Sequence, residues 1–268
     1  MAKEEQFEIL LKVLHKFQEA GILIDLMLIG SWCLQFYRYH FEHPEKLPVF
    51  RTLDVDFLIP HASRFKSEVN VPEILRNEGF ASTFNRSNGI VKYNHKELQV
   101  EFLVPELGKG GDRAREIKNL HIKAVALRYL TLLLDHPLLV DYEGLRIRVP
   151  EPAVFALHKL IVSQERQKLE KQKNDLKMAI ELLDFLSSNP NEVFRVKKIL
   201  DGLPPKWQKM IRLTYEKNYS AFGQRFLNKE LPQIYISCPS CGQPMVYIGG
   251  VDYHCEKCSG PIGKIHSF

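Results

Sequence analysis

The sequence predicts an α+β fold: a mixed sheet with flanking helices, then a helical module, then a small cysteine-rich module. Three observations predict it. Strand-like apolar runs alternate with amphipathic helical segments in the first part of the chain. The pattern turns helical after Pro150 and Pro152, and four of the five cysteines fall in the last part. We therefore expect domains at 1–150, 151–230 and 231–268.

The chain begins with a helix over residues 6–20, where apolar side chains recur at helical spacing. An apolar strand follows at 26–29. The chain then breaks at Gly30-Ser31 and continues as an amphipathic helical run from Trp32 to about residue 41. A helix start preceded by glycine presents free N–H groups, which can bind an anion.

The next strand, expected at about 52–59, carries Asp54 and Asp56 among apolar residues. Residues two apart in a strand point to the same face, so both carboxylates project side by side. Paired carboxylates are costly unless a positive group lies between them, and a hard divalent cation is the usual answer. Metal here and phosphate at the preceding Gly-Ser turn would together make a nucleotide site. The alternative is that both are solvated residues of an edge strand.

The order of these motifs resembles a known signature. Gly30-Ser31, a helix, and then Asp54-x-Asp56 between apolar residues are similar to the pattern of the DNA polymerase beta-like nucleotidyltransferase superfamily. That pattern reads hydrophobic-G-[GS], a helix, hydrophobic-D-hydrophobic-[DE], and a third carboxylate on a later strand. The resemblance implies a nucleotidyltransferase-type mixed sheet.

Two further residues extend the resemblance. Glu101, inside the strand-like run 98–104, is the candidate third carboxylate, and a hairpin with 90–93 would bring it beside the first pair. Arg51 resembles the arginine of the R-x-x-D-x-D form found in the bacterial branch of these enzymes.

The stretch up to residue 150 is less regular. A helix is expected within 61–80, where it restores the alternation of strand and helix. A polar, glycine-rich loop is expected at 105–118. Residues 145–150 alternate apolar and charged side chains, as an edge strand does.

The helical run over 151–186 places Lys159, Arg166 and Lys173 seven residues apart, so a continuous helix would carry them on one face. A solvated, charged face is the plain interpretation. The resemblance favours phosphate binding, because related bacterial enzymes carry a similar lysine, arginine and K-x-D series on a helix after the sheet. Asn174 departs from that series, which leaves Lys171 as an alternative register.

Two more helices are expected near 191–200 and 205–219, and both are rich in lysine and arginine. With Trp207 and Tyr215 they could hold RNA or DNA. They could equally be a solubilising cap on the catalytic domain.

The last module contains two C-x-x-C pairs, each able to direct two thiolates at one ion. Four thiolates complete a closed tetrahedral zinc site, which is structural rather than catalytic. The segment between the pairs reads as a hairpin with a Gly-Gly turn, similar to a zinc ribbon, and His254 is an alternative ligand. The four predicted zinc ligands are Cys238, Cys241, Cys255 and Cys258.

Composition is that of an ordinary globular protein, with 45% hydrophobic and 26% charged residues. No apolar run approaches the roughly 20 residues that span a bilayer, and the charged amphipathic N-terminus does not read as a signal peptide. We therefore expect a cytoplasmic protein without a membrane partner. The net charge of +5 mildly favours an anionic partner.

The resemblance implies a metal-dependent nucleotidyltransferase that moves an NMP from an NTP to an acceptor and releases pyrophosphate. Asp54, Asp56 and Glu101 would be catalytic and would hold Mg²⁺ or Mn²⁺. The expected acceptor is RNA with a tRNA-like end. A protein side chain or a small molecule is the alternative, as is a non-catalytic nucleic-acid or protein-binding module on the same fold. The residues expected to bind the nucleotide are Gly30, Ser31, Arg51, Lys159, Arg166 and Lys173.

Overall fold

The structure is a computed structural model of the 268-residue chain. It describes residues 2–50, 52–86, 89–106, 114–218, 236–237, 244–249, 252–254, 258 and 266–267.

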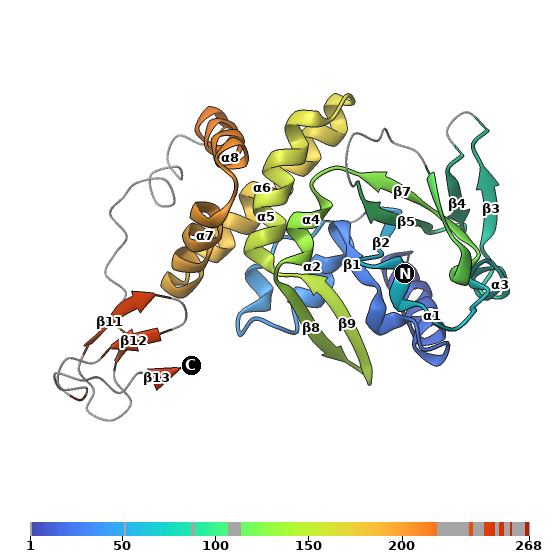
Figure 1. The fold of residues 1–268 in the computed structure, drawn as a ribbon, viewed down its shortest axis with the longest axis horizontal. Coiled ribbons are helices and arrows are strands. Elements are labelled where there is room, and N and C mark those ends of the chain that lie inside the picture. The colour runs from blue at the N-terminus through green and yellow to red at the C-terminus, as the bar shows by residue number, and fades with distance from the viewer. Residues whose placement is uncertain are drawn as a thin grey trace.

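The first part of the chain forms a mixed sheet (Figure 1). Its strands are β1 (Met27–Ile29), β2 (Asp54–Leu58), β3 (Ala81–Phe84), β4 (Val91–Asn94), β5 (Gln99–Pro105), β6 (Ala114–Ile117) and β7 (Ile122–Leu127). The order is β1-β2-β5-β4-β3, with β7 also paired to β5 and β6 paired to β7. Strand β5 runs parallel to β2 and β7, and the other pairs are antiparallel. The strands that carry the predicted site residues are therefore neighbours.

Helices flank the sheet and follow it. They are α1 (Ala2–Glu19), α2 (Cys33–Tyr37), α3 (Val71–Asn77), α4 (Leu130–Leu134), α5 (Pro152–Glu165), α6 (Leu169–Ser187), α7 (Pro190–Gly202) and α8 (Pro205–Asn218). Short 3-10 turns are η1 (Leu23–Asp25), η2 (Gly30–Trp32), η3 (Pro44–Lys46), η4 (Ala62–Arg64) and η5 (Lys118–Leu120). Figure 1 shows α5 and α6 side by side next to the sheet, with α7 and α8 beyond them. The prediction of a mixed sheet with flanking helices is confirmed.

Helix α1 covers one face of the central strands. Phe17 is fully buried, and its ring lies 5.3 Å from that of Phe57 on β2 and 6.3 Å from that of Phe102 on β5. A separate hairpin of β8 (Pro137–Tyr142) and β9 (Leu145–Pro150) leads into α5. The predicted edge strand at 145–150 is thus β9.

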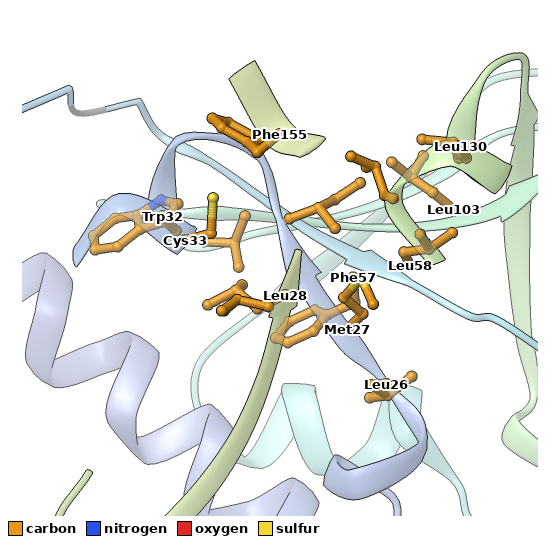
Figure 2. Close-up of a cluster of buried hydrophobic side chains, with 14 of the residues drawn as sticks. Leu26, Met27, Leu28, Trp32, Cys33, Phe57, Leu58, Leu103, Leu130 and Phe155 are labelled. Carbon is orange, nitrogen blue, oxygen red and sulfur yellow. The ribbon is translucent and has the colours of Figure 1, made fainter. Parts of the chain in front are cut away.

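The core continues from the sheet into α5. Figure 2 shows apolar side chains of β1 and β2 with Trp32 and Cys33 just past the end of β1, and Phe155 of α5 beyond them. Tyr37 fixes the same junction, because its hydroxyl donates a 2.7 Å hydrogen bond to the carbonyl of Pro150. Burial of apolar side chains is the main stabilising contribution to the folding of a domain. The end of β1 and the start of α5 are therefore held firmly together.

Three predicted segments are corrected. The expected helix at 151–186 is two helices, because Arg166 adopts an extended conformation with ψ of 124° and lets α6 turn back along α5. The helix after the Gly-Ser turn ends at Tyr37 rather than near residue 41. The expected loop at 105–118 contains strand β6, which pairs with β7.

The last part of the chain contributes four short strands, β10 (Ile236–Ser237), β11 (Pro244–Gly249), β12 (Asp252–His254) and β13 (His266–Ser267). They pair in that order, and β11 and β12 form the expected hairpin. The zinc prediction falls mostly outside the described residues, which include Cys258 but not the other three predicted ligands. Among the described residues, every helix is too short or too polar to cross a bilayer.

Candidate active site

Gly30, at the end of β1, lies against the carboxylate of Asp56. Gly30 follows β1 with φ of +73°, a conformation that L side chains rarely adopt. Because Ile29 pairs with Asp56 across β1 and β2, a Cβ atom on Gly30 would lie 2.6 Å from Asp56 Oδ2. The turn and the carboxylate are therefore close neighbours, and a side chain at this position would force the Asp56 carboxylate to move.

The rest of the turn is held by its own side chains. Ser31 is buried, and its Oγ shares a 2.6 Å hydrogen bond with Thr52 Oγ1. The Cys33 thiol donates to the carbonyl of Gly30 at 2.9 Å, and burial raises the pKa of Cys33 to about 12. The thiol is therefore protonated and acts as a packing residue beside the turn.

The three predicted carboxylates lie on adjacent parallel strands. Asp54 and Asp56 on β2 pair in register with Gln99 and Glu101 on β5. Burial, together with the negative charges of Glu101 and Asp54, raises the pKa of Asp56 to about 7. The charges of Lys159 and Arg166 act in the opposite direction without cancelling this rise. Burial is thus the main reason that the charged form of Asp56 is disfavoured, and the neighbouring acids add to it.

Glu101 has a partner within the sheet. The Lys92 ammonium on β4 contacts the Glu101 carboxylate and also donates to Gln99 Oε1 at 2.9 Å. Within the part of the chain that the structure describes, no three Asp, Glu, His or Cys side chains gather around one point suited to a metal ion. Asp54, Asp56 and Glu101 are thus neighbours on two adjacent strands, and the Glu101 carboxylate is paired with the Lys92 ammonium.

Two of the predicted cations converge on a single buried acid. Lys159 Nζ lies 2.6 Å from Asp175 Oδ1, and Arg166 Nε lies 2.7 Å from Asp175 Oδ2. Burial alone would raise the pKa of Asp175, but both cations outweigh it and lower the pKa below its usual value. The cluster keeps a net positive charge, because it contains two cations and one anion. A buried cation held in this way is preorganised to meet an anionic ligand.

A cleft of about 790 Å³ joins the sheet edge to the helices. The predicted residues that line it are Gly30, Ser31, Asp54, Asp56, Glu101, Lys159 and Arg166. Lys173 is exposed and does not line it, because the break between α5 and α6 removes the shared helix face. Lys171 and Lys168 line the cleft instead. The prediction for Arg51 falls outside the described residues.

Some cleft residues carry no motif and escape sequence reasoning. Tyr129 precedes α4 with φ of +65°, which is strained for a bulky residue and invisible in the sequence. Its hydroxyl lies 3.4 Å from Glu165 Oε1, and its ring lies edge-on to that of Trp207 at 5.6 Å. His158 also lines the cleft, and its only sequence signal is that it precedes Lys159.

His158 is buried, with 6% of its surface exposed. Neither ring nitrogen has a hydrogen-bond partner among the described residues. Burial, reinforced by the charge of Lys159, lowers the pKa of His158 to about 3, although Asp175 acts in the opposite direction. The imidazole is therefore neutral at pH 7.

This histidine should make the protein acid-sensitive. An unfolded histidine has a pKa of about 6.5, so below pH 6.5 the unfolded chain binds one more proton than the folded chain. Stability must then fall as pH falls. From pH 7 to pH 5, the free energy of unfolding of wild type should drop by about 2 kcal/mol more than that of His158→Phe. Denaturant titrations of both proteins at both pH values measure this, and equal drops would contradict it.

Comparisons with known proteins agree with this geometry at the level of family. A protein-family model described as Nucleotidyltransferase matches residues 8–197. No match was found among curated proteins.

Solved structures resemble the chain only distantly. An antigenic nucleotidyltransferase-like protein from Paracoccidioides brasiliensis is 14% identical, with a TM-score of 0.43 over 80% of this chain and 90% of that one. ANT(2″)-Ia in complex with adenylyl-2″-tobramycin is 11% identical, with a TM-score of 0.43 over 80% and 98%. A tRNA nucleotidyltransferase complexed with a primer tRNA and an incoming ATP analog is 18% identical, with a TM-score of 0.25 over 81% and 62%. Because their sequence identities and TM-scores are low, these structures assign no substrate to this chain.

Proposed function

The chain belongs to the nucleotidyltransferase family whose model matches residues 8–197, and from this premise we propose that Asp54, Asp56 and Glu101 form its catalytic centre. The enzyme moves an NMP from an NTP to an acceptor hydroxyl and releases pyrophosphate. The observation that carries the proposal is the register of β2 and β5, which sets Asp56 beside Glu101 and against the Gly30 turn. All of these residues line one cleft with Lys159 and Arg166.

The carboxylates of Asp54, Asp56 and Glu101 each offer the hard oxygen donors that divalent cations prefer, although among the described residues the three do not already surround one point. The raised pKa of Asp56 supports this fit, since a bound cation would stabilise the buried carboxylate in its charged form. Bound Mg²⁺ or Mn²⁺ would stabilise the charge on the transferring phosphoryl group and favour deprotonation of the acceptor hydroxyl. In this proposal Asp54 and Asp56 are the principal ligands, and Glu101 joins them after releasing Lys92.

The remaining cleft residues bind the triphosphate. Backbone N–H groups at Gly30 and Ser31 hold the β- and γ-phosphates at the end of β1. Lys159 and Arg166 neutralise the leaving pyrophosphate, and Asp175 positions both cations through the contacts described above. Lys171, which lines the cleft, takes the role that the sequence predicted for Lys173.

Lys92 should compete with the metal ion for Glu101. A cation that reaches Glu101 must displace the Lys92 ammonium and is repelled by its charge, which is worth roughly 1 kcal/mol at a partly exposed site. Lys92→Met should therefore tighten Mn²⁺ binding to the nucleotide-free protein by about 5-fold. Titration of free Mn²⁺ by electron paramagnetic resonance measures this directly. Lys123→Met, on the exposed side of β7, is the matched control, and equal Mn²⁺ affinity in both variants would contradict the competition.

The acceptor in this proposal is RNA, with a tRNA-like end as the first choice. Its support is the basic character of α7 and α8, where Lys198, Lys206, Lys209 and Lys217 are exposed. Basic surfaces of this kind bind phosphate backbones. A protein side chain or a small molecule is the alternative acceptor.

Labelling identifies donor and acceptor together. The purified protein is incubated with each α-³²P-labelled NTP, with Mg²⁺ or Mn²⁺, and with total RNA or cell lysate. Label on RNA with one nucleotide is the expected result. Label on a protein would replace RNA with the alternative acceptor. No label under any condition, with Asp56→Asn indistinguishable from wild type, would reject nucleotidyl transfer.

We further propose that the four cysteines of the last module bind one structural zinc ion, with domains at 1–150, 151–230 and 231–268. The support is the spacing of two C-x-x-C pairs around the β11–β12 hairpin. Metal analysis by mass spectrometry should give about one zinc per chain, and Cys241→Ser should lose it. Absence of zinc from wild type purified without chelator would refute the ribbon.

A further inference from the structure

The two walls of the cleft differ in chemistry. The α5–α6 wall carries the cations Lys159, Arg166, Lys168 and Lys171 together with the acids Glu165, Glu170 and Asp175. The wall formed by the end of β7 and by α4 presents the apolar side chains of Leu127, Leu130 and Leu133 beside Arg128 and Tyr129. An NTP is divided in the same way, because its triphosphate is highly charged and its nucleoside is uncharged and largely flat.

His158 lines the cleft from the α5–α6 wall. It comes from α5, one residue before Lys159, and Val162 follows one helical turn later on the same face. Lys159 is satisfied by Asp175, whereas both nitrogens of the buried His158 ring have no partner among the described residues. Buried polar groups in folded proteins are nearly always hydrogen-bonded, so an exception that lines a cleft points to a missing ligand.

The protonation state of His158 restricts that ligand. The imidazole is neutral, so it offers one N–H donor and one acceptor nitrogen. A phosphate could use only the donor, and the cations of the same α5–α6 wall offer it charge that a neutral ring does not. A ribose hydroxyl or the edge of a nucleobase can pair with either nitrogen, since each such group can both donate and accept a hydrogen bond.

We propose that His158 is a nucleoside-recognition residue, which hydrogen-bonds a ribose hydroxyl or the polar edge of the base while the triphosphate lies on the α5–α6 wall. This inference rests on the proposed function and adds to it the place where the uncharged half of the NTP binds. The apolar side chains of α4 then cover the nucleoside from the other wall.

Binding of two ligands tests the assignment. Isothermal titration measures the Kd of NTP analogues with a methylene bridge between the α and β phosphorus atoms, and of inorganic tripolyphosphate, which has no nucleoside. For His158→Phe and His158→Leu, we expect the Kd of the preferred analogue to rise by about 10-fold. The Kd of tripolyphosphate should stay unchanged. His136→Phe replaces an exposed histidine outside the cleft and should change neither value.

The same variants separate recognition from folding. Because an apolar ring or chain replaces a buried polar group without a partner, the Tm of the ligand-free variants should not fall below that of wild type. Repeating the titration with the 2′,3′-dideoxy analogue, which lacks both ribose hydroxyls, distinguishes the two sources of the contact. If the ribose is bound, the deficit of the variants disappears with that analogue; if the base is bound, the deficit remains.

Two results would overturn the inference. An equal loss of affinity for the analogue and for tripolyphosphate would place His158 on the phosphates or in the general structure. An unchanged Kd for every analogue would mean that the ring is satisfied by water or contacts the acceptor. Failure of the proposed function looks different, because wild type itself would then bind none of the analogues.

Discussion

Asp56→Asn should reduce nucleotidyl transfer by at least about a thousand-fold. Asp56 lies between Ile29 and Glu101 in the sheet, so it is the carboxylate next to both the Gly30 turn and the third acid. Removing its charge removes the centre of the proposed metal site, and a loss of about 4 kcal/mol of transition-state stabilisation corresponds to that factor. The measurement is the initial rate of label transfer at saturating NTP.

The loss of activity should come without a loss of stability. Burial and the neighbouring acids raise the pKa of Asp56 to about 7, above the usual value near 4. Between these values the folded chain binds more protons than the unfolded chain, so Asp56 lowers stability as pH rises. At pH 8 in metal-free buffer, Asp56→Asn should therefore melt at or above the Tm of wild type. Asp135→Asn, on the exposed surface, should keep both activity and Tm. An inactive variant with a much lower Tm would mean that Asp56 is structural.

The sequence was sufficient to predict what depends on local pattern. The Gly-Ser break, the two-residue spacing of Asp54 and Asp56, and the strand around Glu101 are all readable because strands alternate and turns need glycine. The hairpin of β4 and β5 was predicted as well, but Glu101 reaches the pair through the parallel pairing of β5 with β2. The family match is consistent with the resemblance that these motifs carry.

The features that the sequence did not predict depend on contacts between residues far apart in the chain. No local signal ends α5 at Glu165, where the backbone becomes extended at Arg166 and the returning helix α6 brings Asp175 to that arginine. The heptad spacing therefore predicted a shared face for Lys173 that does not exist. Lys92 and His158 were missed for the same reason, since their importance comes from which neighbour they have or lack in three dimensions.

Gly30→Ala should lower activity by about a hundred-fold and also destabilise the protein. The new Cβ would lie 2.6 Å from Asp56 Oδ2, so the carboxylate must move. A displacement of about 1 Å in a catalytic group can cost a hundred-fold in rate. The residue would also adopt a φ of +73°, which costs roughly 1–2 kcal/mol for an L side chain.

Gly21→Ala is the matched control for the backbone cost. Gly21 has φ of +72°, but nothing lies within 4 Å of a Cβ added there. It should lose about the same 1–2 kcal/mol of stability and keep full activity. The extra loss in Gly30→Ala then measures the contact with Asp56. If both variants lose stability equally and both remain active, the close approach of the turn to the carboxylate is not part of the site.

A double-mutant cycle completes this argument. Asp56→Ala removes the Oδ2 and Cγ atoms that a Cβ on Gly30 would meet, and leaves the Asp56 Cβ at an acceptable 3.8 Å. In that background, Gly30→Ala should cost only the backbone strain seen in Gly21→Ala. The difference in unfolding free energy between the two backgrounds is the coupling energy of the pair, expected at about 1–3 kcal/mol for residues in contact. A coupling near zero would show that Gly30 and Asp56 do not affect each other. The Gly30 turn and the carboxylates would then not form a single site.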